Sequence, residues 1–243
     1  MKIKNYIPNF ITLMNLLSGV ISILFFSQGN LKMAGIMIFV AAIFDFFDGF
    51  LARILKAFSK IGGDLDSLAD MVSFGVAPGF IIYQLILDSH GRQSFMLFGI
   101  DIIPFIAFIV PLFAALRLAK FNVDERQTTS FIGLPSPAAG LLIAALPLMK
   151  AQLYEGQTLF YMVVTNTYFY LGIAIMMSLL MVAELPLFAM KFKSFKIKGN
   201  EVRYLFILIS LTLVITLQFV AIPFIVLTYL FLSLVVFLTD IQS

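Results

Sequence analysis

The sequence contains no cysteine and a single histidine, and only 12% of its 243 residues are charged. The absence of cysteine excludes a disulfide, a thiolate nucleophile and a thiolate-bound metal. Because His90 is the only histidine, a histidine cluster is excluded as well. Any metal ion in this protein therefore has to be held by oxygen ligands.

Apolar residues make up 61% of the chain, and its mean hydropathy is +1.05, far above that of a soluble domain. This composition predicts a polytopic integral membrane protein. The net charge of +3 could suggest nucleic-acid binding, but the basic residues are scattered between apolar runs and form no polar basic patch. We therefore expect no nucleic-acid partner.

Apolar segments of about 20 residues, the length that crosses a bilayer, recur along the chain. They predict an all-α fold of about eight transmembrane helices near 9–27, 33–55, 66–87, 95–119, 134–150, 167–190, 203–219 and 222–239. Only the region of Gln218 to Pro223 separates the last two runs, so a count of seven stays open. We interpret residues 1–243 as one membrane domain, with a six-helix core in 1–190 and two further helices in 191–243.

The positions of lysine and arginine predict the topology of these helices. Of the 16 basic residues, 13 fall on one side, leaving three, Lys32, Arg92 and Lys150, on the other. The positive-inside rule places the larger group, and with it both termini, in the cytoplasm. We expect the protein to be integral to the cell (inner or cytoplasmic) membrane.

Aspartates are concentrated in residues 44–70, at the predicted cytoplasmic ends of the second and third helices. Asp45 and Asp48 are three residues apart and Asp66 and Asp70 are four apart, so each pair shares a helix face. Two facing pairs of carboxylates would repel each other unless cations neutralised them. Asp64, in contrast, is expected to be solvated.

Hard divalent cations, Mg²⁺ or Mn²⁺, suit such a set of carboxylates. Two ions could be held there, and such a pair binds pyrophosphate well. A different class of protein, a divalent-cation transporter, could use the same aspartates. Transporters place ion sites near the membrane midplane between repeated halves, whereas these residues lie at one end and no repeat is visible.

The spacing Asp45-x2-Asp48-Gly49-x2-Ala52-Arg53-x8-Gly62-x3-Asp66-x3-Asp70 resembles the signature of the CDP-alcohol phosphatidyltransferase family. The resemblance implies a CDP-linked lipid as phosphatidyl donor, CMP as leaving group, an alcohol as acceptor and a homodimer. It also implies that the four aspartates hold two metal ions, with Asp70 as general base. Gly49, Ala52, Arg53 and Gly62 would then contact the CDP-lipid.

Flanking segments indicate which alcohol is used. The stretches "SLADMVSFGVAP" (67–78), "IPNFITLMNLLSG" (7–19), "ALRLAKFNV" (115–123) and "FIGLPSPAAG" (131–140) resemble membrane-embedded phosphatidylserine synthases. This resemblance implies CDP-diacylglycerol as donor and L-serine as acceptor. Glycerol 3-phosphate and inositol phosphate stay open as alternative acceptors.

Further contacts are predicted from residue type and position. Asn9, Thr12 and Asn15 recur every three residues on one face of the first helix and are predicted to contact the cytidine and its phosphates. The guanidinium of Arg117 could bind the serine carboxylate, with Ser73 and Asn122 adding hydrogen bonds.

Overall fold

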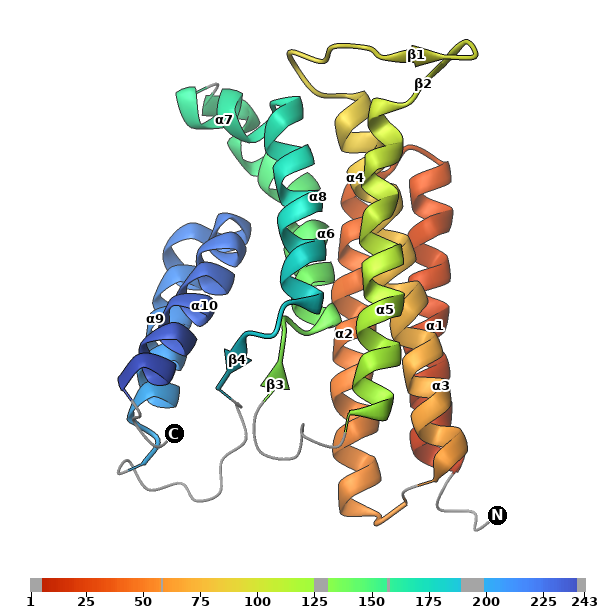
Figure 1. Ribbon diagram of the computed structural model, residues 1–243, viewed down its shortest axis with the longest axis vertical. Coiled ribbons are helices and arrows are strands. Elements are labelled where there is room, and N and C mark those ends of the chain that lie inside the picture. The colour runs from red at the N-terminus through yellow and green to blue at the C-terminus, as the bar shows by residue number, and fades with distance from the viewer. Residues whose placement is uncertain (1–5, 58, 125–130, 157, 189–198, 240–243) are drawn as a thin grey trace.

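The computed structural model describes residues 6–57, 59–124, 131–156, 158–188 and 199–239, and these form an almost entirely helical bundle (Figure 1). The α-helices are α1 Tyr6–Ser27, α2 Leu31–Ile54, α3 Lys60–Asp70, α4 Ala77–Leu87, α5 Ile109–Val123, α6 Ser136–Leu153, α7 Leu159–Val164, α8 Thr167–Val182, α9 Glu201–Leu217 and α10 Ala221–Thr239. Shorter elements are the π-helix η2 Met71–Val76 and the 3-10 helices η3 Ile103–Phe108, η4 Tyr154–Gly156 and η5 Gln218–Val220. Two small antiparallel hairpins pair β1 Met96–Leu97 with β2 Ile100–Asp101, and β3 Phe131–Ile132 with β4 Pro186–Leu187.

The prediction of an all-α membrane protein is confirmed. Within the described ranges, six helical runs are long and apolar enough to cross a membrane, and α8 is a shorter apolar helix of 16 residues. One of the six runs, Glu201–Thr239, is interrupted at Gln218, whose φ of +53° reverses the chain. The separate helices α9 and α10 pack side by side (Figure 1), so the two apolar runs near the C-terminus form two helices.

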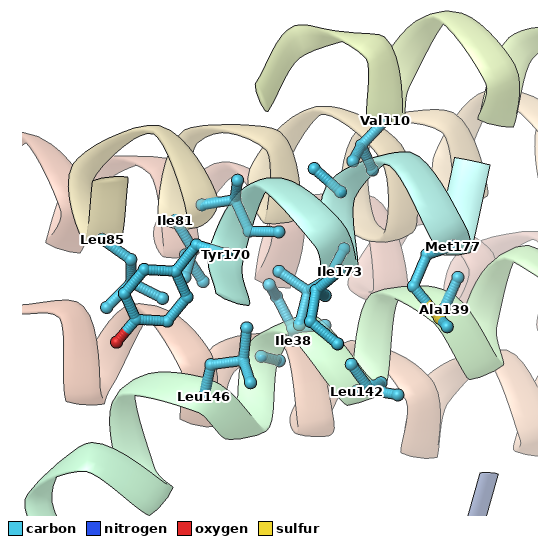
Figure 2. Close-up of a cluster of buried hydrophobic side chains, with 14 of the residues drawn as sticks. Ile38, Ile81, Leu85, Val110, Ala139, Leu142, Leu146, Tyr170, Ile173 and Met177 are labelled. Atoms are coloured by element: carbon cyan, nitrogen blue, oxygen red, sulfur yellow. The ribbon is translucent and has the colours of Figure 1, made fainter. Parts of the chain in front are cut away.

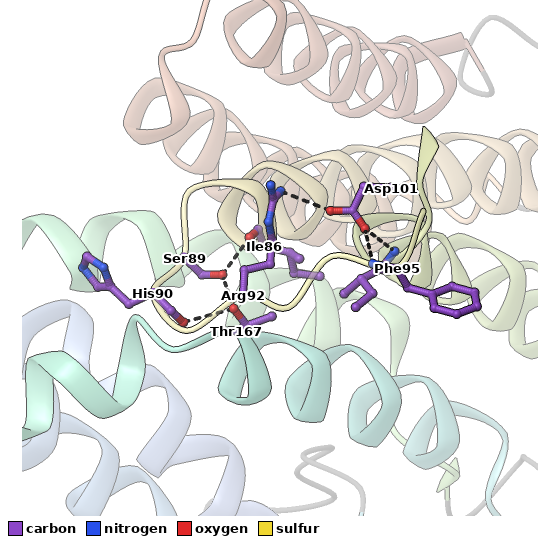
Figure 3. A network of polar contacts seen from close by, with 8 residues as sticks. Ile86, Ser89, His90, Arg92, Phe95, Asp101 and Thr167 are labelled. Atoms are coloured by element: carbon purple, nitrogen blue, oxygen red, sulfur yellow. Dashed lines mark hydrogen bonds and ion pairs between the residues drawn. The ribbon is translucent and has the colours of Figure 1, made fainter. Parts of the chain in front are cut away.

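The predicted helix at 95–119 begins later than expected. Residues 95–102 instead form the β1–β2 hairpin, whose turn contains Phe98 (φ +50°) and Gly99 (φ +79°). The Asp101 carboxylate accepts hydrogen bonds from the backbone N–H groups of Phe95 and Ile103 (Figure 3). These local bonds compete with the helical pattern, which explains why the apolar run alone gave the wrong start.

The core lies between α2, α4, α5, α6 and α8, where branched aliphatic side chains interdigitate around Tyr170 (Figure 2). Small residues let these helices approach closely, as is usual inside membranes. A Cβ added to Gly35 on α2 would lie 2.4 Å from the carbonyl oxygen of Ala144 on α6. A Cβ added to Gly140 on α6 would meet Phe74 of η2 at 3.0 Å.

The alternating direction of the helices gives the bundle two distinct ends. The start of α1, the end of α2, the start of α3 and the end of α10 lie at one end (Figure 1). Lys32, Arg92 and Lys150 lie at the other, near the start of α2, beyond α4 and near the end of α6. The first of these ends carries the four aspartates of the motif, and we call it the aspartate end of the bundle.

Candidate active site

Helix α1 has an unusual buried face, because the side chains it turns inward are polar or small. They are Pro8, Thr12, Asn15, Ser18, Gly19 and Ser22, whereas many of its large apolar side chains are exposed. In a membrane, an apolar outer surface faces lipid and the polar stripe has to find partners within the protein. Helix α1 therefore brings hydrogen-bonding groups to the faces of α2, α3 and η2 that it contacts.

Three of the four motif aspartates converge between α2 and α3. Asp45, Asp48 and Asp66 each place a carboxylate oxygen so that all three atoms lie within 4.8 Å of one another. The fourth, Asp70, is one turn after Asp66, is only 6% exposed, and its carboxyl group contacts that of Asp45. The structure thus brings carboxylates of α2 and α3 together in one cluster.

Helix α1 fixes two of these carboxylates. The Thr12 hydroxyl donates to Asp48 Oδ2 at 2.6 Å, and the side-chain amide of Asn15 donates to Asp70 Oδ1 at 3.2 Å. Ser73 on η2 donates in turn to the backbone carbonyl of Asn15 at 3.0 Å. Close approach is required here, since a Cβ added to Gly19 would meet Ser73 Oγ at 2.5 Å.

Among the residues that the structure describes, the guanidinium of Arg117 on α5 supplies positive charge to this cluster. It is 8% exposed, and it acts electrostatically on Asp45, Asp66 and Asp70. Two contacts orient it: Nη1 donates to the hydroxyl of Ser136 at 3.2 Å, and the guanidinium carbon lies 5.0 Å from the centre of the Phe121 ring. A single guanidinium leaves the four carboxylates with an excess of negative charge.

The carboxylate oxygens of the cluster are suitable ligands for a divalent metal ion. Asp66 Oδ1 is buried and has no hydrogen-bond partner among the described residues, and an orphaned carboxylate oxygen of this kind is costly unless a cation binds it. Three carboxylates within 4.8 Å supply the hard oxygen ligands that Mg²⁺ and Mn²⁺ prefer. The cluster is therefore suited to hold divalent cations.

A cavity of about 220 Å³ opens beside the cluster. Its lining residues are Pro8, Asn9, Thr12, Asp48, Gly49, Ala52, Ala57, Ser59, Gly62, Gly63 and Asp66. We call this space the motif cavity. Five of the seven residues predicted to contact the CDP-lipid line it. A Cβ added to Gly49 would meet no protein atom within 4 Å, so this glycine leaves open space and does not serve helix packing.

The other predicted contact residues lie outside the motif cavity. Arg53 is exposed near the end of α2, and the fully buried Asn15 is engaged with Asp70. Asn122 is hydrogen-bonded to Ser67: its amide nitrogen lies 2.9 Å from Ser67 Oγ, and its amide oxygen lies 3.3 Å from the same hydroxyl. The fully buried Ser73 is engaged with α1. The single histidine, His90, is exposed at the far end of the bundle, where its carbonyl accepts a hydrogen bond from Thr167 (Figure 3).

Several residues of the site were not identified from the sequence. Ser59 caps α3 by accepting from the N–H of Gly62 at 3.0 Å, and the cap lies in the wall of the motif cavity. Ser136 orients Arg117. Glu184 follows the end of α8 and lines a second, smaller cavity together with Arg117. A serine just before a helix is a common N-cap and could have been recognised, but the partners of Ser136 and Glu184 depend on tertiary packing.

Comparison with known proteins shows the family of the chain. The CDP-alcohol phosphatidyltransferase family matches residues 5–180, which is more than half of the chain. A CDP-diacylglycerol–serine O-phosphatidyltransferase of Bacillus subtilis is 38% identical over 146 residues, covering 58% of this chain and 75% of that protein. One of Helicobacter pylori is 32% identical over 212 residues, covering 85% and 80%. An archaetidylserine synthase of Methanothermobacter thermautotrophicus is 35% identical over 148 residues, covering 59% of each chain. The chain belongs to the CDP-alcohol phosphatidyltransferase family.

Proposed function

We propose that this protein transfers the phosphatidyl group of CDP-diacylglycerol to the hydroxyl of L-serine, giving phosphatidylserine and CMP. The observation that carries the proposal is the motif cavity, which joins the predicted nucleotide contacts to the carboxylate cluster in one space. Relatives from two bacteria, 38% and 32% identical, have names that state this activity. The apolar surface of the helices would let the acyl chains of the donor stay in the membrane.

Asp45, Asp48, Asp66 and Asp70 would hold two divalent ions, Mg²⁺ or Mn²⁺. Such ions would neutralise the pyrophosphate oxygens of the donor and the charge that develops on the departing CMP. Gly49 and Ala52 would allow the nucleotide to approach α2 closely, with Asn9 and Gly62 on the opposite wall. The exposed Arg53 would contact a phosphate.

Asp70 would act as the general base. Asn15 holds Asp70 Oδ1, which orients the carboxyl group and leaves its second oxygen to accept a proton. The serine hydroxyl gives its proton to Asp70 as its oxygen bonds to the phosphorus that carries diacylglycerol. The bond from that phosphorus to the oxygen of CMP breaks, and CMP leaves with the electron pair.

The acceptor would bind near Arg117. Arg117 and Glu184 line one cavity of about 30 Å³, room for two or three water-sized groups, so this space would widen to admit serine. A guanidinium and a carboxylate together suit the two ends of a zwitterionic amino acid better than a phosphorylated alcohol. Ser73 and Asn122 would act through the hydrogen bonds that they make within the protein.

The proposal extends to the domain organisation, membrane orientation and association of the protein. Residues 1–243 would form one domain in the cell membrane, with the termini and the aspartate end in the cytoplasm. The boundary expected between 190 and 191 lies outside the described residues. Two chains would associate as a homodimer.

CMP release by the purified protein tests the function directly. The assay supplies CDP-diacylglycerol with Mg²⁺ or Mn²⁺ and compares L-serine with glycerol 3-phosphate and inositol phosphate, using Asp66→Ala as the blank. Serine-dependent release that is lost in the blank is the expected result. Release only with another alcohol would replace the acceptor, and metal flux into liposomes without any release would favour a transporter.

Asp70→Asn tests the role of the base separately. If Asp70 accepts the proton, turnover should fall by at least about 10²-fold, the contribution typical of general base catalysis. Full turnover of this variant with metal bound would show that another group takes the proton.

A further inference from the structure

A cavity lies at the end of the bundle opposite to the four motif aspartates. It has a volume of about 510 Å³ and lies between the turn that joins α1 to α2 and the end of α6. Polar side chains on its wall include Gln28, Asn30, Lys32, Lys150 and Tyr154. We call it the distal cavity, and no step of the proposed reaction uses it.

The two lysines are the notable feature of the distal cavity. Three of the basic residues that the structure describes lie at this end, and two of them, Lys32 and Lys150, line the same space. The third, Arg92, pairs with Asp101 at 3.7 Å (Figure 3). Neither lysine forms an ion pair with another described residue, and no carboxylate is among the described lining residues.

Two ammonium groups that share a cavity repel each other unless an anion lies between them. The cavity also supplies hydrogen-bond donors that a phosphate could use. Because Asn30 caps α2 through its side-chain oxygen, which accepts from Met33 N at 3.1 Å, its amide nitrogen remains to donate. Lys150 is half-buried and Lys32 is exposed, so the cations lie at the mouth of the cavity.

The setting favours a lipid over a free anion. The cavity lies where α1 and α6 end and α2 begins, at the level at which a membrane-spanning bundle meets the headgroups. Its wall includes the apolar side chains of Leu31, Pro147 and Ala151 beside the cations. An apolar wall next to a cationic mouth matches a phospholipid, which carries its phosphate directly beside its acyl chains.

We propose that Lys32 and Lys150 bind the phosphate of an anionic phospholipid in the leaflet opposite to the aspartate end. The lipid would connect the α1–α2 turn to the end of α6. These segments flank the close contact of Gly35 with Ala144, so the lipid would stabilise the α2–α6 packing. This site is independent of the transferase reaction and of its substrates.

The test compares Lys32→Gln, Lys150→Gln and the double variant with Arg92→Gln, which removes one positive charge from the same end of the bundle but outside the cavity. Each protein is placed in nanodiscs of phosphatidylcholine with or without phosphatidylglycerol. Bound phosphatidylglycerol is counted by native mass spectrometry, and the unfolding temperature is measured in parallel. Metal-dependent CMP release reports whether each variant is folded.

Each single lysine variant should retain about fivefold less phosphatidylglycerol, which corresponds to about 1 kcal/mol per lysine. Phosphatidylglycerol should raise the unfolding temperature of the parent protein and of Arg92→Gln but not that of the double variant. Equal retention by the double variant and the parent would overturn the proposal. An equal rise in unfolding temperature with inorganic phosphate in phosphatidylcholine alone would also overturn it, because the ligand would then be the free anion.

Discussion

Thr12 and Asp48, 36 residues apart, share a hydrogen bond of 2.6 Å that ties α1 to the carboxylate cluster of α2. The same hydroxyl lies 3.1 Å from the carbonyl of Pro8, the longer of its two possible bonds. With a single proton, the threonine is expected to donate to the carboxylate, because charged acceptors make the stronger bond. One oxygen of Asp48 is thereby held while the other stays available to a ligand.

Replacement of Thr12 by valine keeps the shape of the side chain and removes this bond. We expect the apparent metal affinity to fall by about 10–100-fold, the usual effect of losing a group that orients a ligand carboxylate. Thr12→Ser restores a hydroxyl and should recover most of that affinity. The measurement is CMP release as a function of Mn²⁺ concentration, and an unchanged half-saturation point for Thr12→Val would refute the role of the bond.

Substitution of Gly49 distinguishes a role in ligand binding from a role in protein packing. Gly49→Ala should not destabilise the fold, since its Cβ meets no protein atom, and the gain in helix propensity favours stability by about 1 kcal/mol. If the nucleotide binds in the motif cavity, the KM for CDP-diacylglycerol should rise by about tenfold. Gly172→Ala on α8, also with no atom within 4 Å, is the matched control and should leave KM unchanged. Equal KM values for both variants would place the nucleotide elsewhere.

Ser136 is expected to tune recognition of the acceptor through Arg117. In Ser136→Ala the guanidinium loses a hydrogen bond of 3.2 Å, and the KM for serine should rise by roughly tenfold, the size expected for one bond to a charged group. The KM for CDP-diacylglycerol should stay the same. Ser178→Ala is a suitable control because Ser178 Oγ is buried without a partner among the described residues. A rise in both KM values would mean that Arg117 serves the donor.

Gly35 tests the packing of α2 on α6. The Cβ of Gly35→Ala would lie 2.4 Å from a backbone oxygen, which cannot move as a side-chain end could. We expect a loss of about 1–3 kcal/mol of stability from this overpacking. The unfolding temperature should fall relative to the parent, whereas Gly172→Ala should not lower it. A fall of the same size in both variants would point to a general effect of added methyl groups.

The fold class and the grouping of the motif aspartates could be anticipated from the sequence for a physical reason. Apolar segments of about 20 residues have few alternatives to a membrane helix, and charged side chains within them need partners. The aspartates of α2 and α3 therefore stood out from an apolar background.

The connections and the neighbours of the site were harder to anticipate. The β1–β2 hairpin replaced the expected start of a helix because Gly99 and Asp101 favour a turn that hydropathy does not detect. The bond from Ser136 to Arg117 joins residues on different helices, and nothing in either local sequence specifies it. Asn15 was expected to contact the nucleotide, but packing of α1 on α3 directs it to Asp70.

The π-helix η2 lies between α3 and α4 and sets the direction in which the side chains of α3 point relative to those of α4. A residue eleven positions after another on an ideal α-helix points in nearly the same direction, so Asp70 and Ile81 would then face the same side. In η2 the N–H of Ala77 bonds to the carbonyl of Val72, five residues back, and this wider turn accommodates an extra residue. One residue corresponds to about 100° of rotation, so η2 turns the carboxylates away from the direction of the hydrophobic core. Shortening Met71–Val76 by one residue would leave the length of the membrane crossing almost unchanged. The turn would then be about 100° different, so either the carboxylate face of α3 or the core face of α4 would lose its present contacts.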